Sequence, residues 1–190
     1  QDPFSISESG LFTVKLTDSS FDCTGVSGCP IDGNGQLTGS FDVESRPWKF
    51  AICTNKSSGG SSNDKDSDSF SAAGESFDVY ARPIKHTDSS DICTNDNLLT
   101  NNYFKSTASV KVTTTLDTPL ITVYPDAKLG DLTPETQLIK QISSNDQSNK
   151  GYKFESLKYS EVGSFNFVAT ETGSFYGSIL GGLSGSKSIG

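Results

Sequence analysis

The stretch that decides the fold is Phe77-Asp78-Val79-Tyr80-Ala81, in which apolar residues alternate with residues that tolerate water. Alternation with a period of two places Phe77, Val79 and Ala81 on one face of a half-buried β-strand. Further strands are expected wherever the chain alternates or is rich in β-branched residues, at 11–16, 37–43, 110–115, 120–124, 165–169 and 174–177. Many short strands separated by turn residues predict an all-β protein, an antiparallel β-sandwich that is immunoglobulin-like or more elaborate.

Only one segment has a helical signature. Residues 133–135 (TPE) combine an N-cap residue, a proline suited to the first turn and an acid, and Leu138, Ile139 and Ile142 could form an apolar side. The expected helix has about two turns, which is too short to define the fold.

Composition limits the class of protein. The chain has 190 residues, of which 33% are hydrophobic and 20% charged, so it is long enough for one domain with a modest core. We expect residues 1–190 to form a single β-rich module, whereas two small sandwiches would place a boundary near residues 100–108. The net charge of −8 argues against nucleic acid or an anionic lipid surface as a partner. No run approaches the roughly 18 apolar residues of a membrane span.

The cysteine content indicates the compartment. An even number of cysteines in an acidic chain rich in Ser, Asn and Gly predicts disulfides in an oxidising, extracellular compartment. Sequence proximity favours the pairs Cys23–Cys29 and Cys53–Cys93 among the three possible pairings. A zinc site is the alternative, but the spacing Cys-x5-Cys suits zinc poorly. The chain lacks Met and a signal peptide, so we expect a mature piece of a longer exported protein.

The chain contains an internal repeat. Residues 40–55 contain SFDVESRPWK and residues 76–95 contain SFDVYARPIK, and each copy ends in Ile-Cys-Thr-Asn. Such a match predicts a repeated structural unit, in which an alternating strand runs into Arg-Pro. The cysteines of the two copies could then meet. Arg46 and Arg82 could form a recognition pair, although scaffolding is the simpler interpretation.

Two motifs carry a resemblance to a known family. Residues 73–83 (AGESFDVYARP) and residues 157–165 (LKYSEVGSF) resemble elements of MshQ-like proteins, and residues 188–190 resemble the start of a stretch that continues in that family. The resemblance covers about residues 37–190. It implies a β-rich domain of unknown function from mannose-sensitive haemagglutinin (type IV pilus) biogenesis proteins, which are bacterial, exported and surface-associated. It implies no catalytic residue.

The residues offer little for catalysis. His86 is the only histidine, so a Ser-His-Asp triad would have to use it, and it lies in a polar stretch. Residues 182–185 (GLSG) do not have the spacing of a nucleophile elbow. No nucleotide-binding motif is present. We therefore expect a protein that is not an enzyme.

Calcium is the one cofactor that the sequence suggests. Asp64, Asp66 and Asp68 place carboxylates at alternate positions, and Glu75 is the twelfth residue counted from Asp64, as in a calcium-binding loop. The sixth position carries serine instead of the usual glycine, and an exposed acidic loop is the alternative. Residues 32–36 also alternate oxygen donors, or form a Gly-rich turn.

Aromatic side chains and loops are the remaining binding candidates. The rings that could stack on sugars are Trp48, Tyr80, Tyr103, Tyr124, Tyr152, Tyr159 and Tyr176. Polar loops at 57–71 and 86–90 could be presented by a rigid scaffold. We expect a non-catalytic module for adhesion or display, with other domains of its parent chain, pilus or surface proteins, or host glycans as partners. The alternative is a structural stalk or filament subunit without its own ligand, which could lend a strand to a neighbour.

Overall fold

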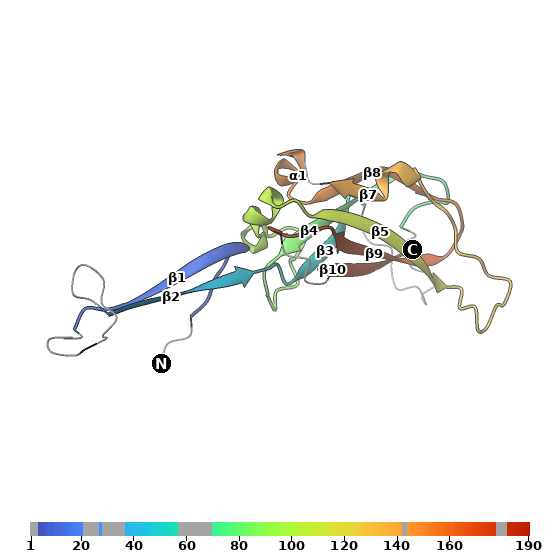
Figure 1. Ribbon diagram of the computed structural model, residues 1–190. Coiled ribbons are helices and arrows are strands. Elements are labelled where there is room, and N and C mark those ends of the chain that lie inside the picture. Colours follow the sequence, from blue (N-terminus) through green and yellow to red (C-terminus); the bar gives the residue numbers. More distant parts are fainter. Residues whose placement is uncertain (1–3, 21–26, 28–36, 57–69, 142–143, 178–181) are drawn as a thin grey trace.

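The computed structural model describes residues 4–20, 27, 37–56, 70–141, 144–177 and 182–190 (Figure 1). In these residues the chain forms strands, with one α-helix of five residues and three 3-10 turns. The strands are β1 (Gly10–Asp18), β2 (Leu37–Ser45), β3 (Lys49–Thr54), β4 (Phe77–Ile84), β5 (Ser109–Thr118), β6 (Leu132–Thr133), β7 (Ile139–Gln141), β8 (Tyr152–Tyr159), β9 (Ser164–Thr172) and β10 (Ser184–Ile189). The helical segments are η1 (Asp96–Leu98), η2 (Asn101–Lys105), η3 (Glu135–Gln137) and α1 (Ser144–Ser148).

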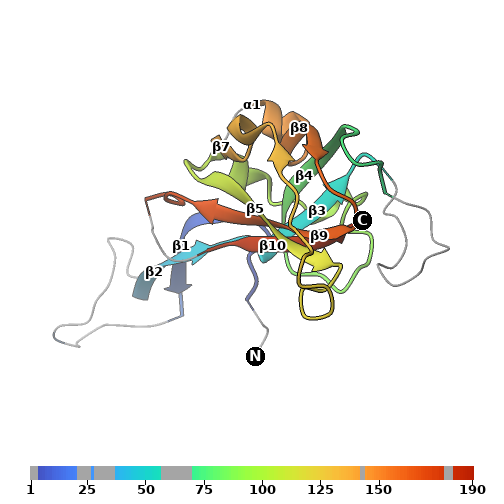
Figure 2. The same cartoon turned by 90° about the vertical axis from the view of Figure 1, so that its right-hand side faces the viewer.

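The strands form two layers and a projection. One four-stranded sheet has the order β10-β9-β5-β7 and the other has the order β3-β4-β8-β6, and all pairs are antiparallel. The two sheets pack face to face (Figure 2). Strands β1 and β2 form a separate two-stranded ribbon, here called the arm, which projects from one end of the sandwich (Figure 1). The predicted all-β antiparallel sandwich is confirmed.

The inner faces follow the alternation of the sequence. Phe77, Val79 and Ala81 of β4 are buried, with exposed fractions of 3%, 0% and 0%. Phe165 and Phe167 of β9 are buried against them from the other sheet. The period-two pattern therefore identifies the core face of both sheets correctly.

Aromatic rings fill the end of the core nearest the arm. Tyr103 of η2 contacts Phe50 and Tyr152 edge-on and stacks on Phe175, with ring centroids 5.9, 6.2 and 5.5 Å away. All four side chains have an exposed fraction of 1% or less. Edge-on and offset stacking adds to the free energy gained by burying these rings. Tyr103 and Tyr152 are therefore core residues and not sugar-stacking platforms.

Two predicted strands and the predicted helix are wrong. Residues 120–124 form a turn, in which the N–H groups of Val123 and Tyr124 bond the carbonyl of Leu120. At 174–177 a single bridge residue, Phe175, precedes a turn. An alternating run becomes a strand only where a neighbouring strand satisfies its backbone, and the described residues supply none beside 120–124.

The helix expected after Thr133 is replaced by the single 3-10 turn η3, followed by β7. Strand β7 pairs with Ser109–Lys111 of β5. Pairing with an existing strand satisfies more backbone groups than an isolated two-turn helix, which is marginal by itself. Ile142 lies outside the described residues.

The two repeat copies do not have the same structure. In the first copy Arg46-Pro47 connects β2 of the arm to β3, whereas in the second copy Arg82-Pro83 lies inside β4. The copies meet at their ends, since β3 pairs with β4 and the N–H of Trp48 bonds the carbonyl of Ile84. The end of the first copy, β3, therefore pairs with the strand of the second copy, β4, as expected if the cysteines of the two copies meet. The strand at the start of the first copy, β2, belongs to the arm instead.

One seam of the sandwich is closed by direct backbone contact. Gly185 of β10 lies so close to β3 that a Cβ at this position would be 1.9 Å from the carbonyl oxygen of Phe50. Only glycine fits without moving one of the two strands. The edges of the two sheets can therefore approach closely on this side.

We predict that Gly185→Ala destabilises the sandwich by about 1–3 kcal/mol, because the methyl group must push β10 away from β3. Gly39→Ala is the matched control, since no atom lies within 4 Å of the position of its Cβ. Thermal unfolding followed by circular dichroism measures both. Equal melting temperatures for the two variants would contradict the close contact.

Candidate functional site

The arm has one apolar and one polar face. In the register of β1 with β2, Phe12 lies opposite Val43 and Val14 opposite Phe41, and residues directly opposite share a face. Leu16 continues the same row. On the other face Thr13 donates a hydrogen bond to Asp42 at 2.7 Å. The structure thus presents an apolar row on a ribbon that stands away from the core.

The apolar row is uncovered in its outer part. Leu16 is 63% exposed and Phe41 is 51% exposed, while Phe12 and Val14 are partly buried. Single exposed apolar residues are ordinary, but a contiguous row on a two-stranded ribbon marks an interaction surface or an aggregation hazard.

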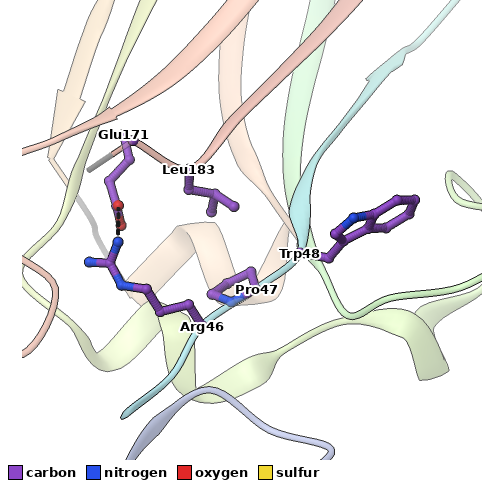
Figure 3. A pocket seen from close by; sticks show the side chains of 6 residues that line it. Arg46, Pro47, Trp48, Glu171 and Leu183 are labelled. Atoms are coloured by element: carbon purple, nitrogen blue, oxygen red, sulfur yellow. Dashed lines mark hydrogen bonds and ion pairs between the residues drawn. The ribbon is translucent and has the colours of Figure 1, made fainter. Parts of the chain in front are cut away.

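The second strand of the arm is fixed to the sandwich by charges (Figure 3). Arg46 follows β2, and its Nε donates to Glu44 Oε1 at 2.7 Å while its Nη1 donates to Glu171 Oε2 at 3.3 Å. The guanidinium also lies over the ring of Phe175, 4.9 Å from the centroid. The side chain of Glu171 is only 5% exposed. A buried carboxylate of this kind is stable only where charge and hydrogen bonds compensate it.

Tyr103 stabilises the second carboxylate oxygen of the buried Glu171. Its hydroxyl donates to Glu171 Oε1 at 2.7 Å. Burial, and next the neighbouring Tyr152, raises the pKa of Tyr103 far above its usual range, so the hydroxyl remains a donor at any ordinary pH. Both oxygens of Glu171 therefore have partners, one from the arm and one from η2.

The first strand of the arm is fixed separately. Glu8 precedes β1, and its carboxylate accepts the backbone N–H groups of Asn101 and Asn102 at 3.1 and 3.0 Å, at the start of η2. These N–H groups have no partner within the 3-10 turn. Both strands of the arm are thus attached to the same part of the sandwich.

Beside this attachment lies a small cavity of about 160 Å³, lined by Arg46, Pro47, Trp48, Glu171, Gly182 and Leu183 (Figure 3). The carboxylate and the guanidinium in it face each other, whereas the ring of Trp48 points away from them. Because Arg46 and Tyr103 occupy both carboxylate oxygens of Glu171, this geometry is suited to positioning the arm.

Trp48 is the exposed aromatic residue beside this cavity. It is 46% exposed, its ring centroid is 4.7 Å from that of His86, and Lys49 Nζ lies 4.3 Å from the indole centroid. Of the seven rings proposed for sugar stacking, only Trp48 and Tyr124 have large exposed fractions. Only Trp48 and Tyr124 therefore remain candidates, among the seven, for stacking on a sugar.

The predicted Cys53–Cys93 disulfide is confirmed, with a Cα–Cα distance of 5.6 Å. It closes a loop of about 40 residues, which contributes about 4 kcal/mol in the chain-entropy model. Cys23 and Cys29 lie outside the described residues, so their pairing stays a prediction.

Arg46 and Arg82 do not act as a pair. Arg82 Nη1 donates to the carbonyl of Cys93, and Nη2 donates to Asp96 Oδ1 at 2.8 Å. The hydrogen bond from Lys150, and then the contact with Arg82, lowers the pKa of Asp96. Arg82 therefore holds the disulfide-bonded segment against β4, while Arg46 holds the arm.

Of the four residues proposed to bind calcium, only Glu75 lies in the described part of the chain. Asp64, Asp66 and Asp68 lie outside the described residues, as do residues 32–36. Glu75 is described, and its carboxylate accepts hydrogen bonds from Lys56 Nζ at 2.6 Å and Ser71 Oγ at 3.2 Å. The bond from Lys56 is the main reason that the pKa of Glu75 is lowered. The described residues contain no cluster of three His, Cys, Asp or Glu side chains able to hold a metal, and calcium at the remaining positions stays a prediction.

The residues that attach the arm were not identifiable from the sequence. Glu171 lies 125 residues from Arg46, and Glu8 lies 93 residues from Asn101. Neither acid belongs to a motif. The one available signal was Arg46 itself, which the repeat singled out.

The fold and this attachment define a disulfide-bonded, all-β sandwich with an arm, and comparison with known families gives its membership. Residues 46–153, more than half of the chain, match the family model of DUF6701, second domain, so the chain belongs to this family. No curated protein and no solved structure matches it. The match begins at Arg46, where the arm joins the sandwich. The resemblance to MshQ itself stays a prediction. Among the described residues no helix has the length and hydropathy to cross a membrane.

We predict that Arg46→Leu lowers the free energy of unfolding by about 3–5 kcal/mol, because Glu171 then stays buried without its cation. Lys56→Leu is the control, since its partner Glu75 is exposed and we expect little change in stability. Denaturant unfolding at pH 7 measures both. A loss for Arg46→Leu no greater than that for Lys56→Leu would contradict the role given to the pair.

Proposed function

We propose that this chain is a non-catalytic module of an exported bacterial surface protein, associated with a pilus, and that it joins its neighbours through the arm. The disulfide, the acidic composition and the resemblance to MshQ-like proteins support an extracellular location. The ion pairs and hydrogen bonds where the arm is attached support a positioning role for Arg46 and Glu171. Adhesion or display would then depend on how such modules are joined.

The observation that carries the proposal is the outer part of the apolar row of the arm, which is uncovered at Leu16 and Phe41. A ribbon of two strands is marginally stable in water, and it gains stability when a third strand or a packed surface covers one side. Here both strands are attached to the sandwich by Glu8 and Arg46, so the arm is held in one direction while its row, with Leu16 and Phe41, faces outward. A fixed and uncovered apolar surface is suited to a neighbouring domain or chain.

An adhesive function is the second candidate, and Trp48 is the observation that favours it. An exposed indole beside a cation and an imidazole can stack on the apolar face of a sugar. Such a site would lie at the base of the arm and would not need the apolar row.

We predict that the chain associates as its concentration rises, and that Leu16→Ser with Phe41→Ser abolishes this. Static light scattering from micromolar to millimolar concentration measures the average mass. Leu11→Ser is the matched control, because Leu11 is 58% exposed but lies on the opposite face of the arm. The melting temperature of the sandwich should change little in both variants.

Two results would contradict this assignment. If the unmodified chain remains a monomer at millimolar concentration, the arm does not join copies. If Leu11→Ser acts like the double variant, the apolar row is not the surface. Binding on a glycan array that Trp48→Ala removes would instead support the adhesive candidate.

A further inference from the structure

We infer that the arm of one copy adds its strand β1 to the free edge of β5 in a second copy, filling an apolar groove beside that edge. The inference rests on the proposed function and names the partner of the arm. Its basis is a second incomplete element in the same molecule, on the side of the sandwich opposite to the closed seam at Gly185.

The edge of β5 is paired over only part of its length. On one side β5 pairs with β9 from Ser109 to Thr118, whereas on the other side β7 pairs only with Ser109–Lys111. The N–H of Val112 bonds the carbonyl of Leu138 at 2.7 Å, and this is the last bond on that side. The second half of β5 is thus an edge without a neighbouring strand in the described part of the chain.

The direction of the free backbone groups follows from the alternation of the ladder. Because the N–H of Val112 points away from β9, those of Thr114 and Leu116 point the same way. No described residue bonds either N–H. An edge of this kind pairs with any extended backbone that reaches it.

A groove of about 460 Å³ runs beside this edge, between β5 and the segment that leads into β6. Its apolar wall consists of Val112, Leu129, Leu132, Leu138 and Ile139. Leu129 is 42% exposed and Ile139 is 59% exposed. An edge with free N–H groups next to an apolar groove calls for an extended strand whose alternate residues are apolar.

Strand β1 has this pattern. Phe12, Val14 and Leu16 lie on one face, and the edge of β1 that faces away from β2 has no partner strand among the described residues. If β1 continues the sheet beyond β5, its apolar row can face the same side as the buried Val112 and so cover the groove. The arm would then gain the third strand that it lacks.

The charges favour β1 over β2 as the added strand. The groove is lined by two acids, Asp131 and Glu135, and one base, Lys111. Strand β1 carries one base, Lys15, and one acid, Asp18, so its net charge is zero. Strand β2 has acids at positions 42 and 44 and no base, so it would be repelled.

The arm cannot fill the groove of its own copy. It projects away from the sandwich, and the free half of β5 is the half that runs toward the opposite end (Figure 1). The donor must therefore be a second copy, and the resulting pair keeps one free arm and one free groove. This is a heterologous contact, which builds chains of copies.

The contact is expected to be weak. An arm of about nine residues is about 30 Å long and about 10 Å wide, so covering it removes about 600 Å² from water over both partners. This is below the roughly 1,200 Å² of a stable complex. Association is therefore expected at high protein concentration or when copies are held together at a surface.

The test uses variants of the complete chain that each lack one half of the contact. The arm variant carries Leu16→Ser and Phe41→Ser, and the groove variant carries Thr114→Pro, which removes an outward N–H that no described residue bonds. Thr114→Val keeps the N–H and is the matched control. Leu129→Glu is a second groove variant, for use if the proline lowers the melting temperature.

We expect each variant alone to lose association by about tenfold or more, and an equimolar mixture of the arm variant with the groove variant to form 1:1 dimers and nothing larger. Sedimentation velocity measures the species. If both groove variants associate as the unmodified chain does while the arm variant does not, the groove is not the acceptor, although the arm still joins copies. If the unmodified chain does not associate at all, both this inference and the proposed function fail.

Discussion

The ion pair between Arg46 and Glu171 makes the arm a fixed part of the molecule. The carboxylate belongs to β9 and is almost fully buried, so it needs both the guanidinium from the arm and the hydroxyl of Tyr103. Such a pair contributes little net stability compared with apolar packing, but breaking it is costly, and its geometry allows one arrangement of the groups that it joins. The direction of the arm is therefore set in part by the requirement to compensate a buried charge, together with the contact of Glu8 with η2.

The two seams between the sheets differ in how closely their edge strands approach. At the seam of β3 and β10, Gly185 permits close backbone contact, and the neighbouring disulfide holds the chain of β3 to the segment before η1. At the seam of β5 and β6, β7 covers only the first part of the edge and a groove remains. An uncovered edge is a liability that proteins usually avoid. In the described part of the chain the arm has no third strand, and the second half of β5 has no neighbouring strand on one side. Each therefore has backbone N–H and C=O groups that the other could pair.

The sequence pattern predicts correctly those parts of the structure in which alternation and local pairing agree. Phe77, Val79 and Ala81 alternate without interruption and form the core face of β4 as predicted. Strand β8 was missed because Ser156 has a positive φ of 54°, which shifts the alternation between Phe154 and Leu157. The alternating run at 120–124 was misleading for the opposite reason, since its pattern is that of a strand but no strand lies beside it. The arm was predicted as strands, yet its attachment to the sandwich depends on Glu171, a distant acid without a motif.

Backbone hydrogen exchange of the unmodified chain, read residue by residue at several protein concentrations, tests most directly whether β1 adds to β5. If β1 adds to β5, the amides of Thr114 and Leu116 and those along the outer edge of β1 become protected together as the concentration rises, while the amides of β4 and β9 stay equally protected throughout. The opposite result, in which Thr114 exchanges at the same rate at every concentration while the chain associates, would show that the free edge of β5 is not where the arm binds.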